Sequence, residues 1–140
     1  MTTQLACLGT IHRMMPYERF RAWQACDALT IAVYRVTARF PRHELYGMTS
    51  QARRAAFSAA ANIAEGSAKR GAREFRRYLD ISIGSLSELS YALHLARKLD
   101  YLSDVEWREI DVLRSRASRL TWRLYARVAE SFRRVPRTSA

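Results

Sequence analysis

Glycine, proline and cysteine are scarce in this chain of 140 residues. Five glycines and three prolines leave few sites for tight turns, which disfavours a turn-rich β protein and favours helices. The two cysteines, Cys7 and Cys26, form no CxxC motif, which argues against a disulfide scaffold and predicts a reduced, cytoplasmic protein. No apolar run reaches the roughly 18–20 residues that a membrane span needs, so we expect no membrane partner.

Patterns that mark catalytic or cofactor sites are also missing. The sequence contains no P-loop, no GxGxxG and no nucleophile elbow. His12, His43 and His94 lie in different segments without a partner at i+4, so they predict no metal site. The N-terminus shows no basic segment followed by an apolar one, so we expect no signal peptide. We therefore expect no cofactor and no enzyme activity.

Acidic residues are few. Thirteen of them against 24 basic residues give a net charge of +11, and only Lys69 and Lys98 among the basic residues are lysine. Residues 53–77 hold seven basic and two acidic residues, and residues 114–137 hold eight arginines and one glutamate. Such an excess is typical of proteins that bind nucleic acid or another polyanion. The alternative is a solvated surface on which arginine reflects the base composition of the genome.

Apolar residues recur at helical spacing in four segments. The expected helices cover residues 17–40, a stretch from an N-cap at Thr49 or Ser50 to a turn at 66–71, residues 72–99, and residues 103–132. The third contains the strictest pattern, with steps of four and three residues and one polar member: Phe75, Leu79, Ser82, Leu86, Leu89, Leu93 and Ala96. Ser103 and Glu106 form a capping box that opens the fourth.

Four helices with short connections predict an all-α protein, an antiparallel up-down four-helix bundle. We expect the bundle to occupy residues 16–132, between a disordered N-terminal tail (1–15) and a basic, disordered C-terminal tail (133–140).

The last expected helix has more than one non-core face. Arginines follow one side of it, and a second set of aromatic residues lies away from its core stripe. The arginines are Arg116, Arg119, Arg123, Arg127 and Arg134, and the aromatic residues are Trp122, Tyr125 and Phe132. A tryptophan on the side opposite the core predicts an oligomer interface. The alternative is that Tyr125 and Phe132 extend the core and only Trp122 is exposed.

Polar residues on the second and third helices could lie close together. The set comprises Arg54, Ser58, Ala61, Asn62 and Glu65, with Glu74, Ser85 and Glu88 on the next helix. We interpret Arg54, Asn62, Glu65 and Glu88 as a structural network that fixes helix register, with Arg54 paired to Glu65 or Glu88. A general acid–base pair is the alternative.

The strings LYGMTSQARRA, ANIAEG, EF and GSLSEL, with WQACDAL and VYRVTARFP upstream, resemble the four-helix bundle protein family associated with intervening sequences in bacterial 23S ribosomal RNA genes. The resemblance covers about residues 17–130, and position 60 is alanine where the family commonly has proline. It implies a small cytosolic bundle that assembles as a homo-oligomer, in this fold group a pentameric barrel with an electropositive surface. No enzymatic activity is firmly attached to the family.

Together, charge and resemblance favour a non-enzymatic, oligomeric protein that binds nucleic acid, with RNA the first expectation. The expected contacts are Arg53, Lys69, Arg70, Arg73, Arg77, Arg116, Arg119, Arg123 and Arg127. The alternative is a protein-interaction scaffold. It follows from a more distant resemblance to the accessory protein of diversity-generating retroelements, which binds a reverse transcriptase.

Overall fold

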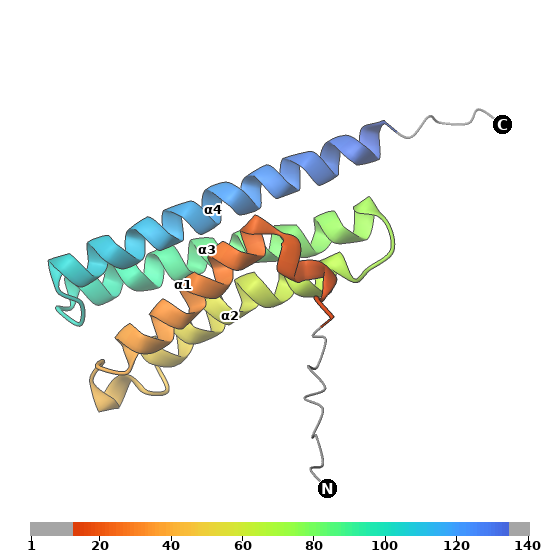
Figure 1. The fold of residues 1–140 in the computed structure, drawn as a ribbon. Coiled ribbons are helices and arrows are strands. Elements are labelled where there is room, and N and C mark those ends of the chain that lie inside the picture. Colours follow the sequence, from red (N-terminus) through yellow and green to blue (C-terminus); the bar gives the residue numbers. More distant parts are fainter. Residues whose placement is uncertain (1–12, 135–140) are drawn as a thin grey trace, which may run out of the picture.

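The computed structural model describes residues 13–134, and within them four α-helices and two short 3₁₀ turns, with no strand (Figure 1). The elements are η1 (Pro16–Arg19), α1 (Arg21–Thr37), η2 (Arg42–Glu44), α2 (Met48–Ser67), α3 (Ala72–Lys98) and α4 (Asp104–Arg133). The all-α expectation is therefore confirmed. Most of the two expected tails lies outside the described residues; Arg13 to Met15 are exposed, and α4 extends one residue into the expected C-terminal tail.

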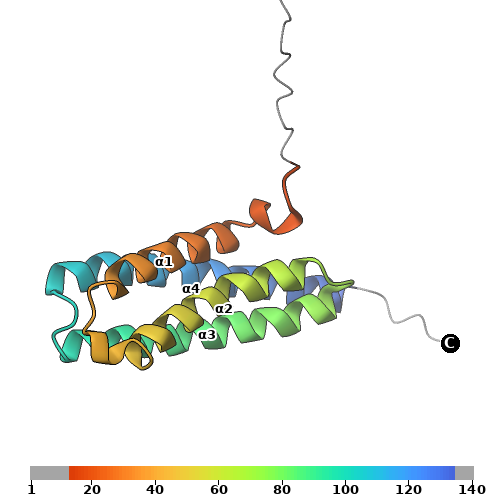
Figure 2. The ribbon, with the colours of Figure 1, turned by 90° about the horizontal axis from the view of Figure 1, so that it is seen from below.

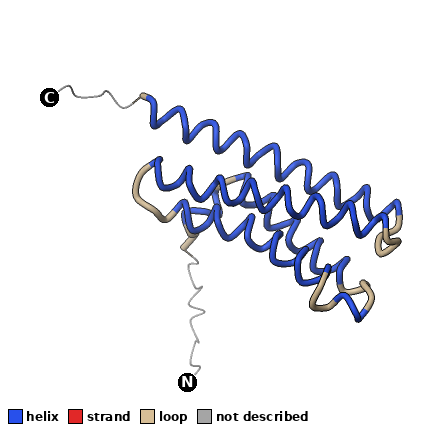
Figure 3. Tube along the Cα trace, turned by 180° about the vertical axis from the view of Figure 1, so that it is seen from behind, coloured by secondary structure: helices blue, strands red, loops and turns tan. Residues whose placement is uncertain are grey.

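Each helix packs against the next one in the sequence, and α4 packs against α1. The α1–α2 and α3–α4 connections lie at one end, on the left in Figure 1, and the α2–α3 connection lies at the other; Figure 2 shows the same grouping from below. The loops between helices, tan in Figure 3, are confined to these two ends. Side chains that belong to α1 and α4 therefore meet although about a hundred residues separate them.

The second helix is rich in alanine, which lets its neighbours come close. The Thr30 hydroxyl of α1 donates to the carbonyl oxygen of Ala56 at 3.0 Å, and the Ser82 hydroxyl of α3 donates to that of Ala59 at 2.7 Å. Side chains can reach a neighbouring helix backbone in this way only where the facing residues carry little bulk. Ser82, the single polar member of the α3 pattern, thus has a partner although it is fully buried.

The α2–α3 turn depends on two glycines. A Cβ on Gly66 would lie 2.7 Å from the Cβ of Tyr78 and 2.8 Å from a ring carbon of Phe75, so only glycine allows this approach. Gly71 has φ of 87°, a left-handed conformation that side chains disfavour, and α3 starts at the next residue.

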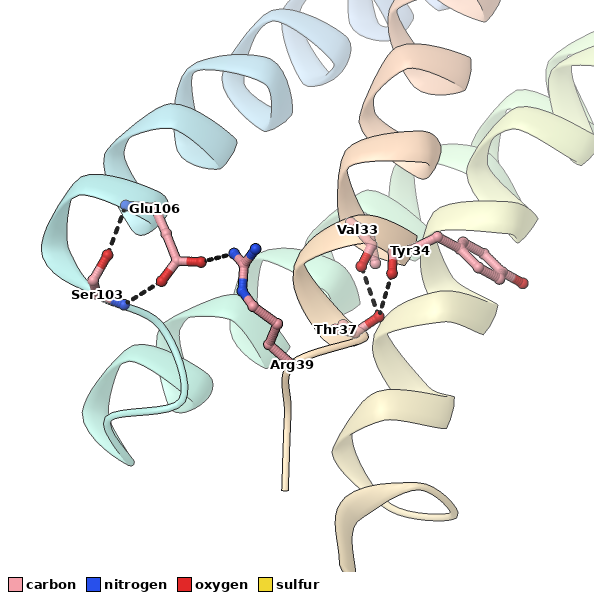
Figure 4. A network of polar contacts seen from close by, with 6 residues as sticks. All are labelled: Val33, Tyr34, Thr37, Arg39, Ser103 and Glu106. Atoms are coloured by element: carbon pink, nitrogen blue, oxygen red, sulfur yellow. Dashed lines mark hydrogen bonds and ion pairs between the residues drawn. The ribbon is translucent and has the colours of Figure 1, made fainter. Parts of the chain in front are cut away.

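The expected start of the first helix is wrong. Instead of one helix from residue 17 to residue 40, η1 comes first, Phe20 is extended, and α1 runs from Arg21 to Thr37. At its end, the Thr37 hydroxyl donates to the carbonyl oxygens of Val33 and Tyr34 at 2.7 and 3.3 Å (Figure 4).

The expected N-cap of the second helix is also wrong. Thr49 is buried inside α2, and Gly47 takes the cap position. The carboxylate of Glu44 accepts a hydrogen bond from the Met48 N–H at 2.7 Å. This carboxylate supplies the acceptor that Thr49 or Ser50 was expected to supply.

The expected capping box at the start of α4 is confirmed. The Ser103 hydroxyl accepts from the Glu106 N–H and the Glu106 carboxylate accepts from the Ser103 N–H, each at 3.1 Å. Arg39, just after α1, donates to the other carboxylate oxygen of Glu106 (Figure 4). One glutamate therefore both caps α4 and joins it to the end of α1.

Candidate nucleic-acid interface

A furrow runs between α1 and α4, because α1 presents alanines to a row of leucines and arginines. Three hollows of about 220, 230 and 260 Å³ follow one another along this contact. Ala32 lies in the first, Ala25 and Ala28 in the second, and Ala22 in the third. Small side chains on one wall leave room that leucine-on-leucine packing would have filled.

The third hollow, at the start of α1, is the most basic. Its lining consists of Arg19, Phe20, Arg21, Ala22, Leu120, Arg123, Leu124 and Arg127, and we call it the arginine hollow. All four arginines are exposed, while Ala22, Leu120 and Leu124 are buried and form an apolar floor. No carboxylate is among the lining residues. The positive end of the α1 dipole faces the same region and adds to its attraction for anions.

The other two hollows are less basic. Arg116 and Gln24 line the middle one. Arg35 and Arg39 line the first, but Glu106 and Glu109 lie with them. Positive charge along the furrow is therefore concentrated at the arginine hollow.

A second basic region surrounds the α2–α3 turn. We call Lys69, Arg70, Arg73 and Arg77 the turn cluster; all four are exposed. Lys69 lies 4.0 Å from the carboxylate of Glu65 and Arg77 lies 3.6 Å from that of Glu74, and both ion pairs are solvent-exposed. Such pairs hold their partners weakly, so the cations can be redirected to a phosphate.

Both basic regions are at the same end of the bundle. The rings of Phe20 and Phe75 lie 5.6 Å apart, which joins the start of α1 to the start of α3. The Arg76 guanidinium lies 5.9 Å from the Tyr125 ring, which joins the start of α3 to the last turns of α4. The arginine hollow and the turn cluster could thus meet one extended anion.

The arginines expected in a row on α4 are distributed between two hollows and the open surface. Arg123 and Arg127 line the arginine hollow, Arg116 lines the middle hollow, and Arg119 is exposed but lines neither. The sequence interpretation missed Arg19 and Arg21. In the sequence, the only sign of their role was their position near the start of a helix. Arg123 and Arg127, which complete the site, come from the far end of the chain.

Arg53 differs from the other expected contacts because its side chain is half-buried, whereas theirs are exposed. Its Nε donates to the Thr37 hydroxyl at 2.9 Å, and its Cζ lies 4.8 Å from the centre of the Tyr34 ring. The side chain is half-buried between α1 and α2. Among the nine expected contacts, Arg53 is therefore poorly placed to bind a phosphate.

The expected polar network is only partly assembled. Asn62 donates to the Ser58 hydroxyl at 3.0 Å, and the Ser58 and Ser85 hydroxyls lie 2.8 Å apart across α2 and α3. Arg54 and Glu88 are exposed, and across residues 13–134 no ion pair joins Arg54 to Glu65 or Glu88. The small serine–asparagine cluster, rather than an ion pair, links the two helices.

The expected oligomer residues are partly described. Trp122 is 56% exposed and meets Tyr125 edge-on, with ring centres 5.7 Å apart. Tyr125 is half-buried and packs against the core. The Phe132 side chain lies outside what the structure describes. Trp122 is thus a large apolar side chain that this chain alone leaves uncovered.

No other feature of the described part suggests chemistry. Over residues 13–134, no three histidine, cysteine, aspartate or glutamate side chains gather as metal ligands. No described helix is long and apolar enough to cross a membrane. Burial raises the pKa of the Cys26 thiol from 9.0 to about 11, more than the hydrogen bond with Thr121 lowers it. Cys7 and His12 lie outside the described residues.

Comparison with known proteins identifies a family. Residues 18–123 match the family described as 23S rRNA-intervening sequence protein. No curated protein matches the chain. The matched range contains Arg19, Arg21 and Arg123, and ends before Arg127.

Proposed function

We propose that this chain, which belongs to the 23S rRNA-intervening sequence protein family, binds nucleic acid, and RNA in particular, through one basic end of its bundle. The arginine hollow is the observation that carries the proposal. It collects four exposed arginines from both ends of the sequence without a lining carboxylate. Like charges gathered in this way repel one another, so a polyanion that neutralises them binds with a favourable electrostatic free energy.

The turn cluster supports the same proposal from the neighbouring edge. Lys69 and Arg70 lie in the connection between α2 and α3, and Arg73 and Arg77 lie on the first turns of α3. The ion pairs of Lys69 and Arg77 are exposed. A folded RNA could contact the hollow and the cluster together. Neither contact needs a cofactor or catalysis, so the proposed protein is a non-enzymatic one. We place it in the cytoplasm, where the free thiol of Cys26 would stay reduced.

Filter binding of the full chain to a structured RNA, at several salt concentrations, tests the proposal. If about four arginines contact phosphates, a plot of log affinity against log salt should have a slope of roughly −3. Replacement of Arg70 and Arg73 by glutamine should weaken binding uniformly across RNA sequences. A protein that binds no RNA at low salt would end the proposal.

We also propose that copies of this antiparallel up-down bundle assemble into a homo-oligomer, a pentameric barrel. Helix connections at alternating ends support the bundle topology (Figure 1). Exposed Trp122 supports the assembly, since large aromatic side chains are favoured as anchors of protein contacts. Light scattering coupled to size exclusion would give the mass, and a monomer at every concentration would contradict the assembly.

The second candidate function is a protein-interaction scaffold, such as an accessory subunit of a retroelement reverse transcriptase. The same exposed Trp122 favours it, since the side chain could contact another protein. A pull-down with a reverse transcriptase encoded beside the gene, together with the RNA measurement, separates the candidates. Capture of the enzyme without RNA binding would favour the scaffold.

A further inference from the structure

The arginine hollow combines two kinds of surface. Arg19, Arg21, Arg123 and Arg127 form a cationic rim, and buried Ala22, Leu120 and Leu124 form an apolar floor. A phosphate ion would use the rim but gain nothing from two leucines. A ligand that uses both surfaces carries an anionic group directly beside a flat, weakly polar one. A nucleotide has this composition.

We propose that the arginine hollow binds one nucleotide of a single-stranded nucleic acid, its phosphate at the rim and its base over the floor. The proposal rests on the nucleic-acid function above and narrows it to unpaired segments. Bases in a single strand can leave their stack and pack on aromatic rings or guanidinium planes. A duplex keeps its bases inside and would present only phosphates to the rim.

The volume of the hollow fits this assignment. At about 260 Å³ it is slightly smaller than the pockets of roughly 300–1,000 Å³ that hold drug-sized ligands. It is large enough for about one base with its sugar and too small to admit a double helix. The neighbouring hollow that contains Arg116 lies next along the furrow and would receive the following phosphate.

The rim is held in place by the fold. The Arg19 guanidinium lies 5.5 Å from the centre of the Phe20 ring, and that ring packs against Phe75. Arg123 and Arg127 are four residues apart on α4, so their side chains project from the same side of the helix. Glu130, almost one turn further along α4, does not line the hollow.

Fluorescence anisotropy of the full chain with a labelled RNA of about 12 nucleotides, single-stranded or annealed to its complement, tests the proposal. The variant is Arg123→Gln with Arg127→Gln. The control is Arg119→Gln with Arg133→Gln, which removes the same charge from the same helix outside the hollow. We expect the variant to lose roughly ten-fold or more in affinity for the single strand, and no more than the control for the duplex.

Two results would overturn the proposal. One is that the variant and the control lose the same affinity for both RNAs. The proposed function of RNA binding would then stand, and only the nucleotide site would be rejected. The other is a wild-type chain that binds neither RNA, which would remove the proposed function as well.

A second measurement isolates the role of the base. In methyl NMR spectra, adenosine monophosphate should shift the signals of Ala22, Leu120 and Leu124, whereas inorganic phosphate should leave them in place. If phosphate binds as tightly as the nucleotide and shifts the same signals, the floor takes no part in recognition and the assignment is wrong.

Discussion

Thr121 of α4 holds its hydroxyl 3.7 Å from the sulfur of Cys26 of α1, and both side chains are fully buried. The Thr121 hydroxyl also donates to the Ala117 carbonyl at 2.8 Å within its own helix. This pair is a polar contact between the first and last helices in the middle of an apolar seam. It lies beneath the furrow and helps to fix how α1 and α4 cross.

The Cys26 thiol should be unreactive while the protein is folded. In a Cys7→Ser background, Cys26 is the only thiol. Its burial and its pKa of about 11 leave almost no accessible thiolate at pH 8. We expect reaction with Ellman's reagent to be slow in buffer and fast in denaturing urea. A rapid reaction in buffer would mean that α1 and α4 separate readily.

Enlarging Ala59 should disrupt the close approach of α2 and α3. Ala59→Leu would push a side chain into the space where Ser82 reaches the helix backbone, and should lower the free energy of unfolding by about 3 kcal/mol. Ala61→Leu, on the half-exposed side of the same helix, should change it by less than about 1 kcal/mol. Urea unfolding followed by circular dichroism measures both, and equal effects would contradict this packing.

The contribution of Glu106 to stability should depend on pH. The Ser103 N–H, and then the Ser103 hydroxyl and Arg39, lower the pKa of Glu106 from its ordinary value of 4.5, against the opposing effect of burial. The charged form therefore stabilises the fold above pH 4.5, and this stabilisation is lost as the pH falls through the lower pKa of the folded state.

Glu106→Gln tests this dependence. At pH 7 the variant should be less stable than wild type by about 0.5 kcal/mol, because the pair is partly exposed. The difference should shrink towards zero near pH 3, as measured by urea unfolding at both pH values. Glu109→Gln serves as the control. A stability difference between wild type and Glu106→Gln that grows as the pH falls would contradict the lowered pKa of Glu106.

Arg53 should matter for stability more than for RNA binding. Arg53→Ala removes the hydrogen bond to Thr37 and the contact with Tyr34, and should cost about 1 kcal/mol in unfolding free energy. Its neighbour Arg54 is exposed, so Arg54→Ala makes the same charge change with little loss of stability. RNA affinity, measured by filter binding, should fall equally in both. If only Arg53→Ala lost RNA affinity, Arg53 would have to be counted among the residues that contact RNA.

Trp122→Glu should abolish self-association. The glutamate would place a charge where the exposed indole is proposed to meet another copy, and burial of an unpaired charge is costly. The mass from light scattering should fall to that of a monomer, 16.2 kDa. Val112→Glu, at an apolar position on the same helix that is 68% exposed, should leave the mass unchanged. Identical masses for wild type and Trp122→Glu would place the contact elsewhere.

Local signals in the sequence predicted those parts of the fold that depend on neighbouring residues. Ser103 and Glu106 are three residues apart and cap α4 as expected. The steps of three and four along α3 bury Leu79, Leu86 and Leu93 as expected. Helical spacing places the capping pair within reach of each other and the three leucines on one face of α3, so both patterns can be read from neighbouring residues.

The failures lie where a distant or irregular contact decides the outcome. Glu44 reaches over a turn to cap α2, so the polar residues Thr49 and Ser50 led to the wrong predicted start of this helix. Arg53 looked like a free cation because its contacts, Thr37 and Tyr34, come from the preceding helix. The arginine hollow forms only because α1 and α4 lie side by side. The spacing of apolar residues in the sequence does not show which helices are neighbours.

The arrangement of the chain ends also governs how the protein can be handled. The η1 turn and the last turn of α4 lie toward the end of the bundle that carries the arginine hollow (Figure 1). A tether attached to either of these two elements would crowd this surface and mask binding. Tyr46, 94% exposed in the α1–α2 connection at the opposite end, is the better position for a dye or a tether.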